Sequence, residues 1–198
     1  MSIWRATALL TFLIFLPTFA NAQWQPVEKV EHYRVSGKTG IELYRSIGEH
    51  GPKVGVGRVI AYTDFKLLWS RDYRPQPDGS CKLVSARPNL TITYRIPKAS
   101  GDMPETTRRA WEVFVEGVMQ HEKVHGEMIV DLVKAIEETS VGLSAPNDRD
   151  CQKVRAGLQS RLGPLSQEQR CRSREFDQVE MRDGGNVHNL VLRLVNGS

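Results

Sequence analysis

The stretch WEVFVEGVMQHEKVHGEMIVDLVKAI, residues 111–136, decides the fold. Its apolar and histidine side chains recur every three or four residues, which is typical of the buried face of an α-helix. The residues on that face are Trp111, Phe114, Val118, His121, His125, Met128, Leu132 and Ile136. We predict a helix from about Glu105 to about Thr139, with a bend near Gly117 or Gly126. The other elements are expected to pack against this face.

The same helix carries the motif H-E-x-x-H, from His121 to His125. Two histidines four residues apart lie one above the other on a helix, so their rings can bind one metal ion. Glu122 is rotated by about 100° from His121, which moves its carboxylate away from the ion but within reach of a bound water. The motif therefore predicts a zinc site with His121 and His125 as ligands and Glu122 as the general base.

Two classes of function follow from this motif. The first is a zinc metallopeptidase, which hydrolyses a peptide or an envelope protein with a metal-activated water. The oxyanion of such a reaction needs a partner, and Arg182 and Tyr94 are candidates. The alternative is a non-catalytic exported module that binds an envelope component and has a degenerate or structural metal site. A metal titration combined with a hydrolysis assay separates the two.

The N-terminus has the pattern of a secretory signal peptide. Arg5 precedes an apolar run from Ala6 to Phe19, and Ala20-Asn21-Ala22 fits a cleavage site. We expect residues 1–22 to be a signal peptide and residues 23–198 to form a single zinc-protease-like domain. The protein is then exported, to the periplasm or outside the cell. No later apolar run is long enough for a stable membrane span after cleavage.

The net charge and the cysteine content indicate which partners and which cellular compartment suit the protein. The formal net charge is +4, with both signs interspersed along the chain, and this does not suggest nucleic-acid binding. There are three cysteines, Cys81, Cys151 and Cys171. In an oxidising compartment they predict one disulfide and one remaining thiol.

The region ahead of the helix predicts a long β-hairpin. Apolar and polar residues alternate over 58–73 and 81–96, and residues 75–80 have the composition of a turn. Pro88 indicates a bulge or an edge position in the second strand. Residues 30–35 are a candidate third strand, and Thr39 can cap a short helix after it. The fold class is therefore α+β: a small antiparallel sheet packed against the H-E-x-x-H helix.

Helices follow at the C-terminal end of the chain. Asp148 or Asp150 can cap a helix that runs to Leu162, and Gly163-Pro164 is expected to end it. A second helix is predicted over residues 167–181. The short apolar stretch 187–195 fits a final strand or a poorly ordered tail.

These features together resemble a family of bacterial secreted proteins, catalogued as a domain of unknown function and described as predicted zinc-dependent proteases. The resemblance covers most of residues 23–198. Its marks are Tyr33-Arg34-Val35-Ser36-Gly37, Gly51-Pro52, Trp69, Cys81, Ile96-Pro97, Trp111, Phe114, the H-E-x-x-H motif and Cys151. It implies zinc-dependent proteolysis, and it implies a Cys81–Cys151 disulfide with Cys171 free. Both cysteines of that pair are expected at the ends of elements.

One segment departs from the family. Its members tend to close with Tyr-Asp-x-x-Thr-x-His-Gly, where this chain has residues 176–183, with Phe176 in place of the tyrosine and Arg182 in place of the histidine. If that histidine is the third metal ligand in the family, this chain uses another group. The candidates are Glu180, Asp183, Asp177 and His188.

Overall fold

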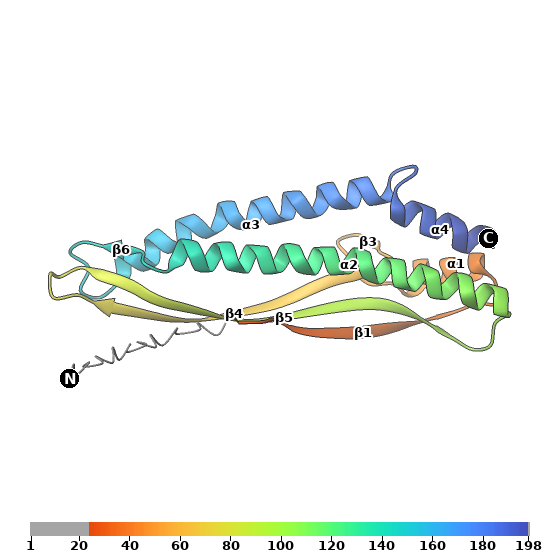
Figure 1. Cartoon of the computed structure of the whole chain (residues 1–198), viewed down its shortest axis with the longest axis horizontal. Helices are drawn as coiled ribbons and strands as arrows, with labels where there is room; N and C mark the ends of the chain where they lie inside the picture. The colour runs from red at the N-terminus through yellow and green to blue at the C-terminus, as the bar shows by residue number, and fades with distance from the viewer. Residues whose placement is uncertain (1–23, 198) are drawn as a thin grey trace, which may run out of the picture.

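A computed structural model describes residues 24–197, and the predicted signal peptide lies outside them. The elements are β1 (Val27–Ser36), α1 (Gly40–His50), β2 (Lys53–Val54), β3 (Gly57–Arg58), β4 (Tyr62–Pro75), β5 (Cys81–Ser100), α2 (Glu105–Ser140), β6 (Ser144–Ala145), α3 (Gln152–Met181) and α4 (Asn186–Asn196). The predicted α+β class is confirmed, with a long hairpin, a long helix and C-terminal helices in that order (Figure 1). Within residues 24–197, no helix is long and apolar enough to cross a membrane.

The sheet is mixed, whereas the sequence predicted an antiparallel one. β4 pairs antiparallel with β5, but β1 lies on the other side of β5 and runs parallel to it, from Val27 beside Thr91 to Ser36 beside Ser100. The chain leaves β1 through α1 and returns along β4 before it reaches β5, so β1 and β5 have the same direction. Pro88 lies between the parts of β5 that pair with β6 and with β1. It therefore occupies a local edge, where its missing N–H is tolerated.

The core lies between β5 and α2. Alternate residues of β5 are buried, and they face buried side chains of α2, of which Trp111, Phe114 and Val118 were predicted from the helical spacing and Ile129 and Val133 were not. The main contributors are Leu90, Ile92, Tyr94 and Ile96 from β5 and Trp111, Phe114, Val118, Ile129 and Val133 from α2. These side chains fix α2 lengthwise along the sheet, with α3 along the far side of α2 (Figure 1).

The glycines of α2 serve close packing, and α2 is one continuous helix rather than two segments. An added Cβ at Gly126 would lie 2.2 Å from the hydroxyl oxygen of Tyr94, and one at Gly117 would lie 2.4 Å from Leu190 Cδ1. The missing side chains at these two positions let β5 and α4 approach α2.

Two predictions for the C-terminal region were wrong. α3 continues through Gly163 and Pro164 as one helix of 30 residues. Proline removes one donor from the helix, but both residues are exposed here, so the carbonyl left without a partner can meet water. Residues 187–195 belong to helix α4, not to a strand or a tail. Val187, Leu190 and Leu194 share one face of α4 and are buried.

The predicted disulfide is present between Cys81, the first residue of β5, and Cys151, directly before α3. Its Cα atoms are 5.2 Å apart, and it joins residues 70 apart in the sequence. Cys171 is free, as predicted. The bond attaches the start of α3 to the sheet.

Removing this bond is expected to destabilise the protein. Replacing both Cys81 and Cys151 with alanine should lower the free energy of unfolding by about 2–5 kcal/mol, because the unfolded chain regains the freedom of a long loop. Urea denaturation followed by circular dichroism measures the change. Cys171→Ala is the control and should leave the midpoint unchanged. Equal midpoints for the double variant and the native chain would show that the bond does not contribute to stability.

Candidate metal centre

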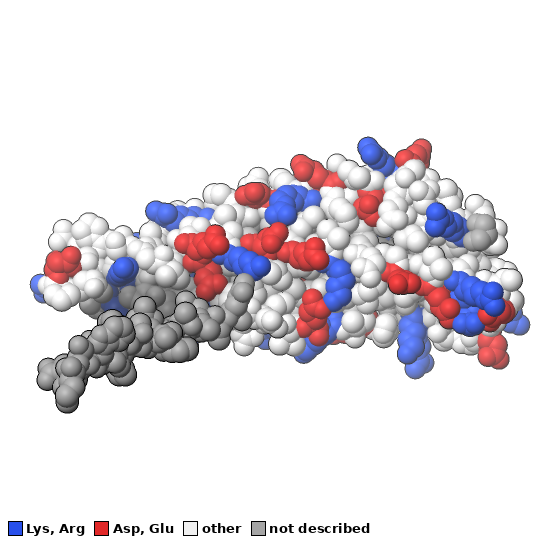
Figure 2. Space-filling view, viewed as in Figure 1, with Lys and Arg blue, Asp and Glu red and all other residues white. Residues whose placement is uncertain are grey.

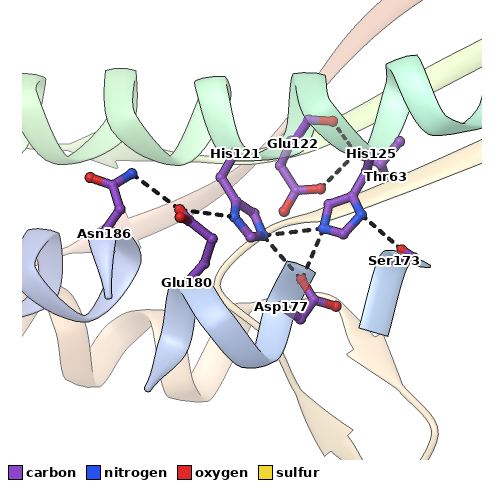
Figure 3. A network of polar contacts seen from close by, with 8 residues as sticks. All are labelled: Thr63, His121, Glu122, His125, Ser173, Asp177, Glu180 and Asn186. Atoms are coloured by element: carbon purple, nitrogen blue, oxygen red, sulfur yellow. Dashed lines mark hydrogen bonds and ion pairs between the residues drawn. The ribbon is translucent and has the colours of Figure 1, made fainter. Parts of the chain in front are cut away.

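Three side chains from two helices converge on one point. His121 and His125 project from α2 toward α3, and Asp177 projects back from α3 (Figure 3). Asp177 Oδ1 lies 3.2 Å from His121 Nε2 and 2.9 Å from His125 Nε2, and the two Nε2 atoms are 3.2 Å apart. Both imidazoles are buried. The sequence placed the two histidines together, and the structure adds Asp177 as the third group.

These distances fit a single metal ion. Zinc binds nitrogen and oxygen ligands at about 2.0–2.2 Å, so two ligand atoms of a tetrahedral site lie about 3.3 Å apart. The three observed separations are close to this value. Two nitrogens and one carboxylate oxygen all point inward, and one cation between them would contact all three. The residues present therefore fit a metal ion.

A second layer of contacts orients the two imidazoles. Ser173 Oγ lies 2.8 Å from His125 Nδ1, which is hydrogen-bond distance. Glu180 Oε2 is 3.7 Å from His121 Nδ1, and that nitrogen is buried without a hydrogen-bond partner among the described residues. Asn186 Nδ2 donates to Glu180 at 3.2 Å. Such outer contacts fix the tautomer and the orientation of histidine ligands in metal sites.

Phe176 closes one side of the centre. Its ring stacks on His121 at 4.8 Å between centroids and meets His125 edge-on at 5.4 Å. It occupies the position at which the resembled family has tyrosine. The ring packs against both imidazoles and limits the directions in which they can turn.

The charges in the centre are coupled. Burial alone would raise the pKa of Asp177, but hydrogen bonds and charge from His121 and His125 outweigh burial and hold this pKa well below its usual range. Burial alone would lower the pKa of His121, but Asp177 and the charges of Glu122 and Glu180 raise it. The centre therefore favours a positive charge between Asp177 and the imidazoles, and a bound cation meets the same preference.

Glu122 lies beside the three converging groups without joining them. Thr63 Oγ1 of β4 donates to Glu122 Oε2 at 2.6 Å and lies 3.1 Å from the main-chain oxygen of Glu122. Only 5% of Glu122 is exposed, and burial raises the pKa of its carboxyl. The carboxylate is thus held in one orientation by the sheet and has an increased affinity for a proton.

The metal centre opens into a cavity of about 510 Å³. Its walls come from the chain around β4, from α2 and from α3. The lining residues include Val59, Ala61, Thr63, Phe65, Glu122, Ile129, Leu132, Ser166, Gln169, Ser173 and Met181. The wall around β4 is largely apolar and the α3 wall is largely polar, whereas α2 contributes His121, Glu122 and His125 together with the apolar Ile129 and Leu132. A substrate in this cavity would lie next to Glu122 and the converging ligand atoms.

The other candidates from the sequence lie outside the centre. Glu180 belongs to the outer contacts, and Asp183 lies 4.0 Å from His188 rather than near His121 or His125. Arg182 and Tyr94 do not line the cavity. The hydroxyl of Tyr94 donates to Glu28 at 3.1 Å. Sequence reasoning missed Thr63 and Ser173, because a single hydroxyl far along the chain carries no pattern of its own.

Acidic and basic side chains are interspersed over the visible face of the protein (Figure 2).

A family model described as "Bacterial protein of unknown function (DUF922)" matches residues 30–185, which include α2 and all of α3. No curated protein and no solved structure matches the chain.

Proposed function

The chain belongs to the DUF922 family of bacterial proteins, and we propose that it is an exported zinc-dependent metallopeptidase. One observation carries the proposal: the ligand atoms of His121, His125 and Asp177 converge beside Glu122 at the wall of one cavity. This combination supplies a place for an ion, a base and space for a substrate.

Zinc is the ion that this set of residues favours. A catalytic zinc site has three protein ligands and keeps one position open, whereas a structural site has four protein ligands. His121, His125 and Asp177 supply three. Two histidines and one carboxylate also suit non-haem iron. Glu122 favours zinc, because the spacing H-E-x-x-H places a base beside the ion, as hydrolysis requires.

The residues of the centre and of the cavity wall have separate roles in the proposed reaction. A zinc ion held by His121, His125 and Asp177 would supply a water of lowered pKa and would polarise the substrate carbonyl. Glu122 takes a proton from the attacking water and transfers it to the leaving amine. Thr63 holds Oε2 of Glu122 during both transfers, and burial of the carboxyl makes it a better proton acceptor. The apolar walls from Ile129 and Leu132 keep bulk water away.

An edge strand beside the cavity supports a peptide as the substrate. β4 pairs only with β5 among residues 24–197, so its other edge has no strand partner there. Thr63, Asp64 and Phe65 of β4 line the cavity. The N–H of Phe65 donates to the carboxylate of Asp64 at 2.8 Å, and we infer that it points to the free edge, where a peptide carbonyl would replace that carboxylate as the acceptor. An extended peptide can bind along such an edge through its main chain.

This mode of binding predicts a difference between two variants of Phe65. Phe65→Pro removes the edge N–H and should raise KM for peptides by about tenfold, the value of one lost hydrogen bond of about 1.4 kcal/mol. Phe65→Ala keeps the N–H and is the matched control for the lost side chain. Steady-state kinetics on one peptide, with circular dichroism to check folding, measures both. Equal KM values for the two variants would contradict main-chain binding at Phe65.

The proposed activity is tested on the protein from residue 23 onward, produced with its disulfide formed. The chain is loaded with zinc, dialysed, and analysed for bound metal and for cleavage of a mixed peptide library by mass spectrometry. We expect one zinc per chain and cleavage that a chelator stops and zinc restores. Activity that is restored by iron(II) and not by zinc after the chelator would contradict the choice of ion. A chain that binds no metal and cuts no peptide would instead be the non-catalytic envelope-binding module.

Two features of the chain support its export from the cytoplasm. Residues 1–22 have the pattern of a signal peptide, and the Cys81–Cys151 disulfide is typical of proteins in oxidising compartments. The proposed substrates are therefore peptides or proteins of the bacterial envelope. Fractionation of cells that express the full chain tests this, since cleavage after Ala22 and recovery outside the cytoplasm are expected.

A further inference from the structure

We propose that Arg170 of α3 selects substrates that carry a carboxylate about 10 Å from the bond that is cut. This distance is the helical rise between Arg170 and Asp177. This inference rests on the proposed peptidase function. It names the class of peptide that the cavity accepts, which the metal centre alone does not determine.

Arg170 is a cation without a partner in the cavity wall. It lines the cavity, and no other lysine or arginine among residues 24–197 does so. It forms no ion pair or side-chain hydrogen bond with any described residue. The neighbouring arginines differ: Arg172 lies 3.4 Å from Asp131, and Arg174 donates to Cys171 at 3.2 Å. The guanidinium of Arg170 is therefore available to a ligand.

The position of Arg170 on α3 sets how far along the helix it lies from Asp177, next to which the bond would be cut. Arg170, Ser173 and Asp177 follow the spacing of one helix face, and Ser173 contacts His125. Asp177 is the seventh residue after Arg170, which is about 10 Å along a helix. An extended peptide rises about 3.3 Å per residue, so this span corresponds to about three residues of substrate.

The other charged residues of the cavity indicate that the carboxylate of the substrate binds at the α3 wall. The opposite wall contributes Asp64, whose carboxylate is 3.7 Å from Arg95 and would repel another anion. Glu122 and Asp177 are engaged with Thr63 and the histidines. Arginine binds carboxylates through two parallel N–H donors. The group it recognises is either an acidic side chain or the free C-terminus of the peptide.

Paired peptides test the inference and separate these two sources. One set is blocked at both ends and carries glutamate at successive positions, each peptide with a glutamine twin. A second set has a free C-terminus at the same positions, each with an amidated twin. Cleavage by the zinc-loaded protein gives kcat/KM, and binding of the same peptides to the Glu122→Gln variant gives Kd without turnover.

We expect one position at which the peptide with the carboxylate has a kcat/KM about tenfold higher, and a Kd about tenfold lower, than its neutral twin. A tenfold change corresponds to a charge-assisted pair of about 1.4 kcal/mol. Preference in the first set identifies a side chain, and preference in the second identifies the C-terminus. Arg170→Gln should remove the preference and Arg170→Glu should reverse it. Arg172→Gln is the matched control, two residues along α3, and should keep it.

The outcomes separate this inference from the proposed function. A preference that Arg170→Gln removes in binding supports the inference even if no peptide is cut, and then only the peptidase assignment fails. A preference that survives Arg170→Gln, or equal values for carboxylate and neutral twins with active protein, overturns the inference and leaves the peptidase assignment standing. A chain that neither cuts nor binds any peptide overturns both.

Discussion

Replacing Asp177 with alanine is expected to abolish zinc retention. Its carboxylate oxygen is the only oxygen among the three converging ligand atoms, and it lies 2.9–3.2 Å from both imidazole nitrogens. Without it two histidines remain, which is one ligand fewer than a catalytic zinc site has. The affinity should fall by more than about a hundredfold, beyond the effect of losing an outer contact. Competition with a chromogenic chelator measures it.

Two variants separate Asp177 from the other acidic candidates. Glu180→Gln removes a charge that lies 3.7 Å from His121 Nδ1, so the affinity should fall by about 10- to 100-fold, as for an outer contact. Asp183→Asn should have no effect, because Asp183 is fully exposed and faces His188. A protein that keeps zinc after Asp177→Ala but loses it after Glu180→Gln would identify Glu180 as the ligand instead.

Replacing Glu122 with glutamine is expected to remove hydrolysis and keep the metal. The amide has nearly the same shape and can still contact Thr63, but it cannot take a proton from water. Loss of general-base catalysis should lower kcat by about 10²- to 10⁴-fold. Elemental analysis and peptide hydrolysis on the same sample measure the two properties separately.

Glu127→Gln is the matched control for this variant. It makes the same chemical change on the same helix, but Glu127 is exposed and does not line the cavity. Its metal content and kcat should equal those of the native protein. If Glu122→Gln loses the metal, the carboxylate is a ligand rather than the base. If it retains full activity, another group takes the proton.

The parts of the fold that could be predicted are those with local patterns. The helical spacing from Trp111 to Ile136 identified α2 and its buried face, and the alternation before it identified the hairpin. Thr39 was predicted as a helix cap, and it forms a capping box with Glu42 at the start of α1. These features depend on residues that are neighbours in sequence. The disulfide was implied by the family resemblance instead.

The parts that could not be predicted depend on contacts between distant segments. Asp177 is 56 residues from His121, and four candidates in its region had no spacing that distinguished them. The run of polar residues in α3 gave little sign of its continuity, and Pro164 suggested a break. The parallel direction of β1 follows from the route of the chain through α1. In each case, tertiary packing decided among local alternatives.

The shallow attachment of α3 has a thermodynamic consequence for the metal centre. Of its 30 residues, only Val154 and Leu158 are buried, and both lie near the disulfide end. Asp177 is 26 residues beyond Cys151, about 39 Å along the helix. Helix α4, which follows nine residues after Asp177, is buried again through Val187, Leu190 and Leu194. An ion shared between α2 and α3 would therefore cross-link a stretch of α3 that lies between these two anchored ends and buries no side chain of its own. Part of the binding free energy of the ion would go into ordering that stretch, so apparent affinity and helix docking form one linked equilibrium.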